Sequence, residues 1–183
     1  MIKPITLENE RVRLSPLTLE NYTNLLSVAS EPKLIQYSPS DIESPAALRT
    51  YVETALDQQK KNTSIPFIIY DKKNGDFAGC TRYMNIDHSN KVLEIGATWI
   101  GKKFQGTGLN SEMKHLLINH AFIGLVFEKV SFRIDERNTR SRKAVEKLGA
   151  VLEGILRENV YLLDGFKRNT CVYGILKNEW DII

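Results

Sequence analysis

The chain has 183 residues and a formal net charge of +3, and 42% of its residues are hydrophobic and 26% charged. This length suits one domain with its own core, so we expect residues 1–183 to form a single domain. The composition excludes disordered and low-complexity classes, and so small a net charge does not demand a nucleic acid as partner.

The N-terminal segment and the two cysteines bear on where the protein works. Charged residues interrupt MIKPITLENERVRL where a signal peptide needs an apolar run, and no window of the sequence is as apolar as a membrane helix. We therefore expect a cytoplasmic protein that does not enter a membrane. In that reducing compartment Cys80 and Cys171, which lie in strand-like segments, are expected to be buried free thiols.

The first half of the chain predicts one strand, two helices and three further strands. Residues 11–16 alternate as an edge strand does, and apolar residues at helical spacing follow over 22–29. Ser44 followed by Pro45 is typical of a helix start, and an apolar stripe continues from there. Two strands then flank the hairpin turn at Asn74-Gly75.

The next strand, 92–100, runs directly into a glycine-rich turn. Strict alternation divides its side chains between the two faces of a sheet. One face would carry Leu93, Ile95, Ala97 and Trp99, and the other Glu94, Gly96 and Thr98.

The second half predicts a helix from Leu109, a strand over 129–135, a helix capped by Asn138, and a hairpin about Asp164-Gly165. Strand, turn, helix and strand form a βαβ unit, so the strands at 92–100 and 129–135 should be parallel. The full order is β α α β β β α β α β β. It predicts an α/β (α+β) protein with a mixed, mostly antiparallel central sheet and helices on both faces.

The stretch FQGTGLNSE, residues 104–112, crowds two glycines against a helix start. Glycine permits φ > 0 and close approach, and a helix start presents unpaired N–H groups with partial positive charge, so the turn suits a phosphate. A nucleotide P-loop is excluded because no lysine follows Gly108 at the required spacing. A dinucleotide fingerprint is disfavoured by Ser111 at its third small-residue position and by the preceding antiparallel hairpins. The pyrophosphate loop of an acyl-CoA enzyme remains.

Two segments, KFQGTGLNSEMKHLLINHAF and RIDERNTRSRKAVEKLGAVLEGILRE, resemble the core motifs of the GNAT acetyltransferase superfamily. The second is similar to the RimJ/RimL-like branch of ribosomal-protein N-acetyltransferases. The resemblance extends over nearly the whole chain, because the order of elements matches as well. It implies the GNAT fold and transfer of an acetyl group from acetyl-CoA to a primary amine, either a ribosomal or other protein N-terminus or a small molecule.

The resemblance also implies a coenzyme site around the glycine turn. The R/Q-x-x-G-x-G/A motif of the family falls on residues 103–108, with lysine at the first position. Backbone N–H groups over 105–110 would hold the pyrophosphate, and the family's N-x-x-S/A pair would lie along the pantetheine arm near its sulfur. The expected coenzyme-binding residues are Trp99, Ile100, Lys103, Phe104, Gln105, Gly106, Thr107, Gly108, Leu109, Asn110, Asn138, Ser141 and Arg142.

The group that protonates the leaving thiolate stays open. The family often has a tyrosine seven residues after the motif asparagine, whereas this chain has Val145. The proton could come from Ser141, from the substrate ammonium, or from a tyrosine of another element: Tyr83, Tyr161 or Tyr173. The missing tyrosine also leaves an alternative open, a non-catalytic acyl-CoA-binding or regulatory module of the same fold.

Glu94 is the candidate general base. The resemblance implies that the amine attacks the thioester directly in a ternary complex, where positioning supplies much of the acceleration. A primary amine is mostly protonated at neutral pH, so a base or a water chain must first remove a proton. Glu94 is the lone carboxylate of its strand and lies beside the expected site. A backbone N–H near Trp99 or Ile100 would meet the oxyanion.

The other polar features predict no additional chemistry. His88, His115 and His120 lack metal-ligand spacing, so no metal is expected. The basic segment RNTRSRK would serve the 3′-phosphate and adenosine of the coenzyme or form a solvated helix face, and we expect no nucleic acid as partner. Either a monomer or a homodimer is compatible with the sequence.

Overall fold

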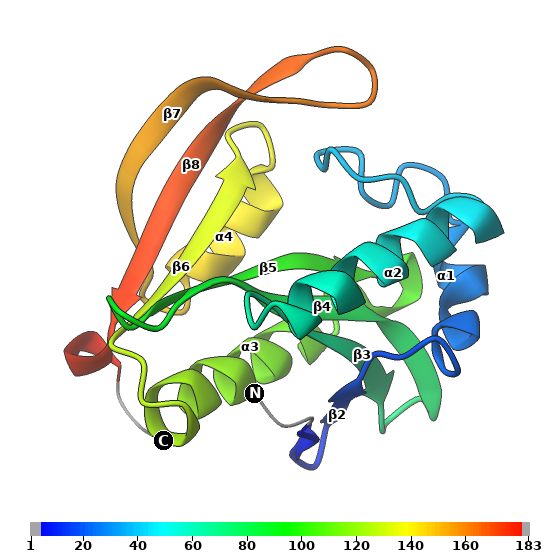
Figure 1. The fold of residues 1–183 in the computed structure, drawn as a ribbon, viewed down its shortest axis with the longest axis horizontal. Coiled ribbons are helices and arrows are strands. Elements are labelled where there is room, and N and C mark those ends of the chain that lie inside the picture. The colour runs from blue at the N-terminus through cyan, green and yellow to red at the C-terminus, as the bar shows by residue number, and fades with distance from the viewer. Residues whose placement is uncertain (1–4, 181–183) are drawn as a thin grey trace.

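The computed structural model describes residues 5–180 and is built on an eight-stranded sheet with strand order β1-β2-β3-β4-β5-β6-β8-β7 (Figure 1). The strands are β1 (Leu7–Glu8), β2 (Val12–Pro16), β3 (Ile65–Asp71), β4 (Asp76–Asp87), β5 (Val92–Ile100), β6 (Lys129–Asp135), β7 (Val151–Tyr161) and β8 (Lys167–Leu176). Neighbouring strands are antiparallel except β5 and β6, which are parallel as the βαβ pattern predicts. The predicted order is confirmed, with β1 added outside the expected edge strand β2.

Helices cover both faces of this sheet. The chain forms η1 (Tyr22–Leu25), α1 (Leu26–Ala29), α2 (Pro45–Lys60), η2 (Lys102–Phe104), α3 (Leu109–Asn119), the π-helical turn η3 (His120–Gly124), α4 (Thr139–Glu146) and η4 (Lys177–Glu179). Consecutive residues of β4 show the two faces. The Tyr83 hydroxyl donates to the carbonyl of Leu117 in α3 at 2.6 Å, whereas the guanidinium of Arg82 stacks over the ring of Tyr51 in α2 at 4.6 Å.

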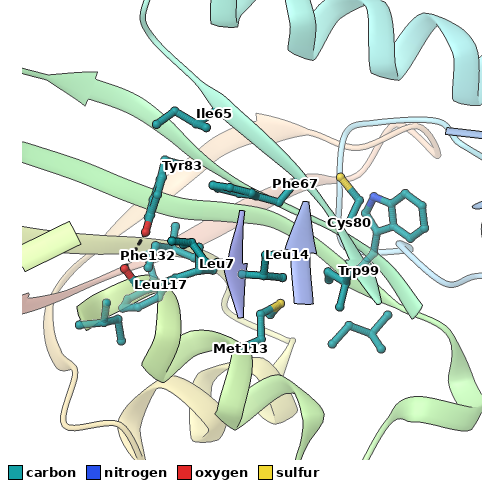
Figure 2. Close-up of a cluster of buried hydrophobic side chains, with 14 of the residues drawn as sticks. Leu7, Leu14, Ile65, Phe67, Cys80, Tyr83, Trp99, Met113, Leu117 and Phe132 are labelled. Carbon is teal, nitrogen blue, oxygen red and sulfur yellow. Dashed lines mark hydrogen bonds between the residues drawn. The ribbon is translucent and has the colours of Figure 1, made fainter. Parts of the chain in front are cut away.

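The core fills both sides of the central strands. Between the sheet and α3 lie fully buried side chains that include Phe67, Tyr83 and Leu117 (Figure 2). Cys80 and Cys171 are both buried free thiols, as the sequence predicts. Burial raises the pKa of the Cys80 thiol to about 11, so this thiol stays protonated at neutral pH.

A β-bulge interrupts β5 at Ala97, whose φ is 48°. The register with β4 passes from the pair Arg82 and Gly96 to the pair Cys80 and Trp99, so β5 holds one more residue than β4 in this interval. An extra residue moves every later side chain of the strand to the opposite face.

The bulge corrects the expected division of β5. Trp99 lies on the α2 face, where its indole N–H donates to the Tyr51 hydroxyl at 3.4 Å, and Thr98 lies on the α3 face, where it accepts from Lys114 at 3.2 Å. The prediction that Leu93, Ile95, Ala97 and Trp99 share one face, and Glu94, Gly96 and Thr98 the other, is therefore wrong after Gly96. Hydrophobic periodicity carries no signal for a bulge, so it predicts uninterrupted alternation of side chains through Ala97.

Candidate active site

A cleft of about 1640 Å³ crosses the sheet on the side of α2. Its walls come from α2, from the loop that precedes α2, from β4 to β8, from the first turns of α3 and from α4. In Figure 1 the loop between α1 and α2 and the β7–β8 hairpin both lie above the central strands.

The cleft enters the sheet where β5 and β6 separate. These strands pair at only three positions, which join Val92, Leu93 and Glu94 to residues 129–131. Both strands continue beyond Glu94, and their residues 95–100 and 132–135 line the cleft instead of pairing with each other. One backbone edge of β5 therefore has no strand partner in the described sheet, and its N–H and C=O groups need another partner.

Gln105 spans the mouth of this separation. Its side-chain amide donates to the carbonyl of Ile100 at 2.8 Å, and its side-chain oxygen accepts from Arg140 at 2.6 Å. The glycine turn is thereby tied to the end of β5 and to the first turn of α4.

The start of α3 is open in a way that the starts of α2 and α4 are not. Ser44 caps α2 and Asn138 caps α4 through side-chain oxygens that accept from Ala47 N–H at 3.1 Å and Ser141 N–H at 3.2 Å. Gly108, at the start of α3, has no side chain to cap the helix. The first N–H groups of α3 therefore lack the side-chain acceptor that the other two helices have.

Both turn glycines adopt left-handed backbone conformations beside this open helix end. The φ angles are +76° at Gly106 and +88° at Gly108, and a Cβ added to either would meet no atom within 4 Å. Both residues line the cleft. The backbone conformation favours glycine, and the empty space leaves room for a ligand to approach the backbone closely.

A buried lysine lies between β5 and β6 at the bottom of the cleft. Lys114 of α3 is 6% exposed, and its ammonium donates to Thr98 and lies 5.6 Å from the ring centre of Phe132. It has no ion-pair partner within residues 5–180. Burial lowers its pKa from 10.5 to about 8.

Glu94 lies in the cleft with its side chain only 7% exposed. The side-chain amide of Asn85 donates to its carboxylate at 2.8 Å, and the Nε of Arg133 lies 3.7 Å away. Burial raises the pKa of Glu94, and the hydrogen bond from Asn85 opposes that effect. Gly96 leaves space for this side chain, because a Cβ there would lie 3.1 Å from Oε1 of Glu94.

The structure gathers many of the expected coenzyme-binding residues around the cleft. Those that line it are Trp99, Ile100, Gln105, Gly106, Gly108, Asn110, Asn138 and Ser141. Phe104 and Leu109 are instead buried in the core. Lys103 forms an ion pair with Asp76 at 2.5 Å.

The side chains of the remaining expected residues, Thr107 and Arg142, form hydrogen bonds within the protein. The Thr107 hydroxyl donates to the carbonyl of Phe104 at 2.7 Å. Arg142 donates to the Tyr173 hydroxyl at 2.9 Å and to the carbonyl of Glu136 at 3.1 Å. These side chains do not belong to the cleft lining.

The three tyrosines considered as acids do not line the cleft. The hydroxyls of Tyr83 and Tyr173 are engaged on the α3 and α4 side of the sheet, and Tyr161 is 64% exposed on β7. The structure therefore does not favour any of the three as the acid. The tyrosines that do line the cleft are Tyr37 and Tyr51, which lie far from the recognised motifs in the sequence and were missed for that reason.

The basic segment before and within α4 divides between structural and cleft-facing roles. Arg137 binds the carboxylate of Asp135 through two contacts of 3.1 and 2.8 Å and stacks on Phe166 at 3.8 Å. Arg137 lines the cleft as well, together with Arg140 and Lys143.

Residues 5–180 carry no sign of a metal site or of a membrane-spanning helix. No group of histidine, cysteine and acidic side chains there could hold a metal ion. No helix there is both long and apolar enough to cross a membrane.

Comparison with known proteins places this geometry in a family. The description "Acetyltransferase (GNAT) domain" matches residues 11–151. YdaF of Bacillus subtilis, named as a ribosomal N-acetyltransferase, is 31% identical over 144 residues, covering 76% of each chain. A GCN5-related N-acetyltransferase from Brucella melitensis superposes with a TM-score of 0.88 at 25% identity, covering 98% of this chain and 81% of that one.

Another solved structure shares the fold at lower identity. Mycobacterium smegmatis RimJ, solved in complex with CoA-disulfide, superposes with a TM-score of 0.83 at 20% identity, covering 96% of this chain and 89% of that one. The family match covers β2 to β6 and α1 to α4, which include the glycine turn and Glu94, and it ends before β8. The protein therefore belongs to the GNAT family and is an N-acetyltransferase.

Proposed function

We propose that this single-domain protein transfers the acetyl group of acetyl-CoA to a primary amine by direct attack within a ternary complex. One observation carries the proposal: the uncapped start of α3, the unpaired edge of β5 and the buried carboxylate of Glu94 all face one cleft. An anion site, an extended channel and a base are what this reaction requires.

The coenzyme fits the open features of the cleft. Its pyrophosphate would lie on the N–H groups of 105–110, where both glycines leave room for it and the helix end favours negative charge. Its pantetheine arm would lie between β5 and β6, with Asn138 and Ser141 along it. The side chains of Arg140 and Lys143 are available for the nucleotide phosphates.

The reacting centre would lie beside Glu94. The carboxylate accepts a proton from the ammonium, directly or through water, and the free amine then attacks the thioester carbonyl. Ile100 suits the oxyanion better than Trp99 does. A Cβ on Gly79 would lie 1.9 Å from the carbonyl oxygen of Trp99, so the carbonyl and the N–H of Trp99 point toward β4. The carbonyl of Ile100 instead accepts from the side chain of Gln105, so the N–H of Ile100 points away from β4 and toward the cleft.

The leaving thiolate needs a proton, and Ser141 is the remaining side-chain candidate from the sequence. Its hydroxyl has no hydrogen bond within the described part of the chain, and the residue lines the cleft. The amine itself is the other source, because it releases a proton when the amide forms.

The acceptor class follows from the relatives. YdaF is named for ribosomal acetylation, so a ribosomal-protein N-terminus is the first acceptor to test here. Such an acceptor would place the reaction in the cytoplasm.

The test incubates the protein with acetyl-CoA and a panel of amines, and follows free thiol and acetylated acceptor together. We expect thiol release that depends on the acceptor and matches the acetylated product in amount. Tight binding of acetyl-CoA without acceptor-dependent thiol release across protein N-termini and small amines would contradict the proposal.

A further inference from the structure

Three buried polar atoms in residues 5–180 have no hydrogen-bond partner: Nε of Arg82, Nε of Arg168 and the hydroxyl oxygen of Thr170. Folded proteins satisfy most buried polar groups, so each exception needs an explanation. All three residues line the cleft that holds Glu94. Their placement indicates that a polar ligand completes this part of the protein.

Strand register places two of these residues on the same face of the sheet as Glu94. Glu94 pairs with Ser131 of β6, and Asp135 of β6 pairs with Thr170 of β8. Paired residues share a face, as do residues two apart on one strand. Arg168, two residues before Thr170, therefore lies on the Glu94 face and extends the site beyond the coenzyme channel.

The charge of Arg168 is offset only in part, by Asp135 and Glu94 at longer range than an ion pair. Its Nη1 donates to the carbonyl of Tyr37 at 2.5 Å, but it has no ion-pair partner among residues 5–180. The nearby Asp135 is already occupied by both contacts from Arg137. Burial lowers the pKa of Arg168, which records the cost of keeping this charge partly away from water.

Two further arginines, Arg133 and Arg82, line the cleft together with Glu94. Arg133 is the one guanidinium within ion-pair distance of Glu94 in the described chain. Arg82 is 5% exposed and is held by the Tyr51 ring and by the side-chain oxygen of Gln58, neither of which carries a negative charge. An acceptor with several positive charges would meet these guanidiniums unfavourably.

We propose that the acceptor carries a carboxylate close to its amine, and that Arg168 binds it and sets acceptor specificity. This inference rests on the proposed acetyl transfer. The guanidinium provides charge-assisted hydrogen bonds to the carboxylate, while Glu94 receives the amine proton. The carboxylate belongs either to an acidic side chain near a protein N-terminus or to the α-carboxylate of a small amino acid.

The experiment compares acceptors that differ only in this group. One arm uses N-terminal peptides with amidated C-termini that carry Glu, Gln or Lys at the second position. The other arm uses a free amino acid and its amide. In at least one arm the parent should prefer the carboxylate over the carboxamide by about 10- to 100-fold in kcat/KM, the worth of a charge-assisted hydrogen bond.

Variants assign the preference to Arg168. Arg168→Gln should reduce the carboxylate-to-carboxamide ratio toward one, and Arg168→Lys should keep part of it because the charge remains. Arg49→Gln removes the same charge from the exposed face of α2, outside the cleft, and should leave the ratio unchanged.

The outcomes separate this inference from the proposed function. No transfer to any amine would contradict the function itself. Transfer with equal use of carboxylate and carboxamide in both arms would overturn only the acceptor inference. Equal loss of both acceptors in Arg168→Gln would also overturn it, because that is the result expected if Arg168 merely holds the loop at Tyr37.

Discussion

Under the proposed function Glu94 serves as the base, and the burial of its carboxylate favours that role. Its pKa is raised by burial, yet Asn85 and Arg133 remain close enough to favour the charged form in part. A raised pKa brings a carboxylate closer in basicity to the ammonium that it must deprotonate. Because burial disfavours the charged form, ionised Glu94 also lowers the stability of the folded protein.

We expect Glu94→Gln to lower the turnover rate at pH 7 by roughly 10²- to 10⁴-fold, the usual worth of a positioned base. The deficit should shrink toward about pH 9.5, where more of the amine is free in solution. Steady-state rates of both proteins against pH test this, with the folded fraction checked at each point. Parental rates at pH 7 would exclude Glu94 as the base.

Stability supplies an independent check on the same variant. A carboxyl whose folded pKa is raised above 4.5 is most favourable when protonated, and its contribution to stability is lost as pH rises through the folded pKa. Relative to the parent, the glutamine variant should therefore gain stability from pH 4 to pH 7 in denaturant unfolding.

Lys114 gives a second prediction at the level of a single residue. Burial lowers the pKa of Lys114 from 10.5 to about 8, so the buried charge destabilises the folded state most strongly below pH 8. Lys114→Met should raise the melting temperature at pH 7, and this gain should fade between pH 8 and pH 10.5. It should also weaken acetyl-CoA binding if the cation at the floor of the cleft serves the coenzyme.

Thermal unfolding across that pH range and calorimetric titration with acetyl-CoA measure the two effects. Lys60→Met is the control, because Lys60 has a 78% exposed side chain at the end of α2 and lies outside the cleft. A gain in stability that does not change with pH would show that the buried charge of Lys114 is not its cause.

At the level of elements, the glycine turn before α3 offers a matched comparison. Gly108 and Gly165 have nearly equal φ angles, +88° and +83°, and a Cβ would meet no atom within 4 Å at either. Gly108 lines the cleft, whereas Gly165 lies in the β7–β8 turn outside it. Substitution by alanine should therefore impose similar backbone strain at both sites.

We expect both alanine variants to lose a comparable amount of stability and only Gly108→Ala to lose acetyl-CoA affinity. Denaturant unfolding and calorimetric titration with acetyl-CoA are the measurements. Equal coenzyme affinity in the two variants would place the pyrophosphate away from this turn.

Local patterns in the sequence predicted most elements because their signals are local. Ser44 and Asn138 act as the helix caps that their positions indicate, and Asn74-Gly75 joins two antiparallel strands. The bulge at Ala97 has no comparable signal, since its cost is offset by contacts with other strands. That single residue decides the faces of Thr98 and Trp99, and with them part of the cleft wall.

At the level of the whole molecule, the residues proposed to bind the coenzyme have a local sequence signal, whereas Arg168, proposed to bind the acceptor, has none. The turn at 105–110 and the cap at Asn138 belong to contiguous motifs. Arg168 meets Tyr37 across 131 residues of sequence, and no local pattern joins them. Such contacts depend on the packing of the loop before α2 against β8, which only the complete fold provides.

Hydrogen exchange tests the arrangement of the whole cleft. Acetyl-CoA should slow the exchange of backbone amides in 98–100 and 105–110, because bound ligand would cover the β5 edge and the start of α3. The hairpin turn at 162–166, outside the cleft lining, is the internal control and should not change. Uniform slowing, or protection restricted to the control turn, would contradict the proposed binding mode.

The short pairing of β5 with β6 has a consequence for self-association. Unpaired strand edges attract other extended chains, and proteins usually protect them. Here the unpaired edge lies inside the molecule, with Gln105 and Arg140 joined across its mouth. An edge enclosed within one chain is less exposed to pairing with a second protein molecule than the outer edge of an open sheet.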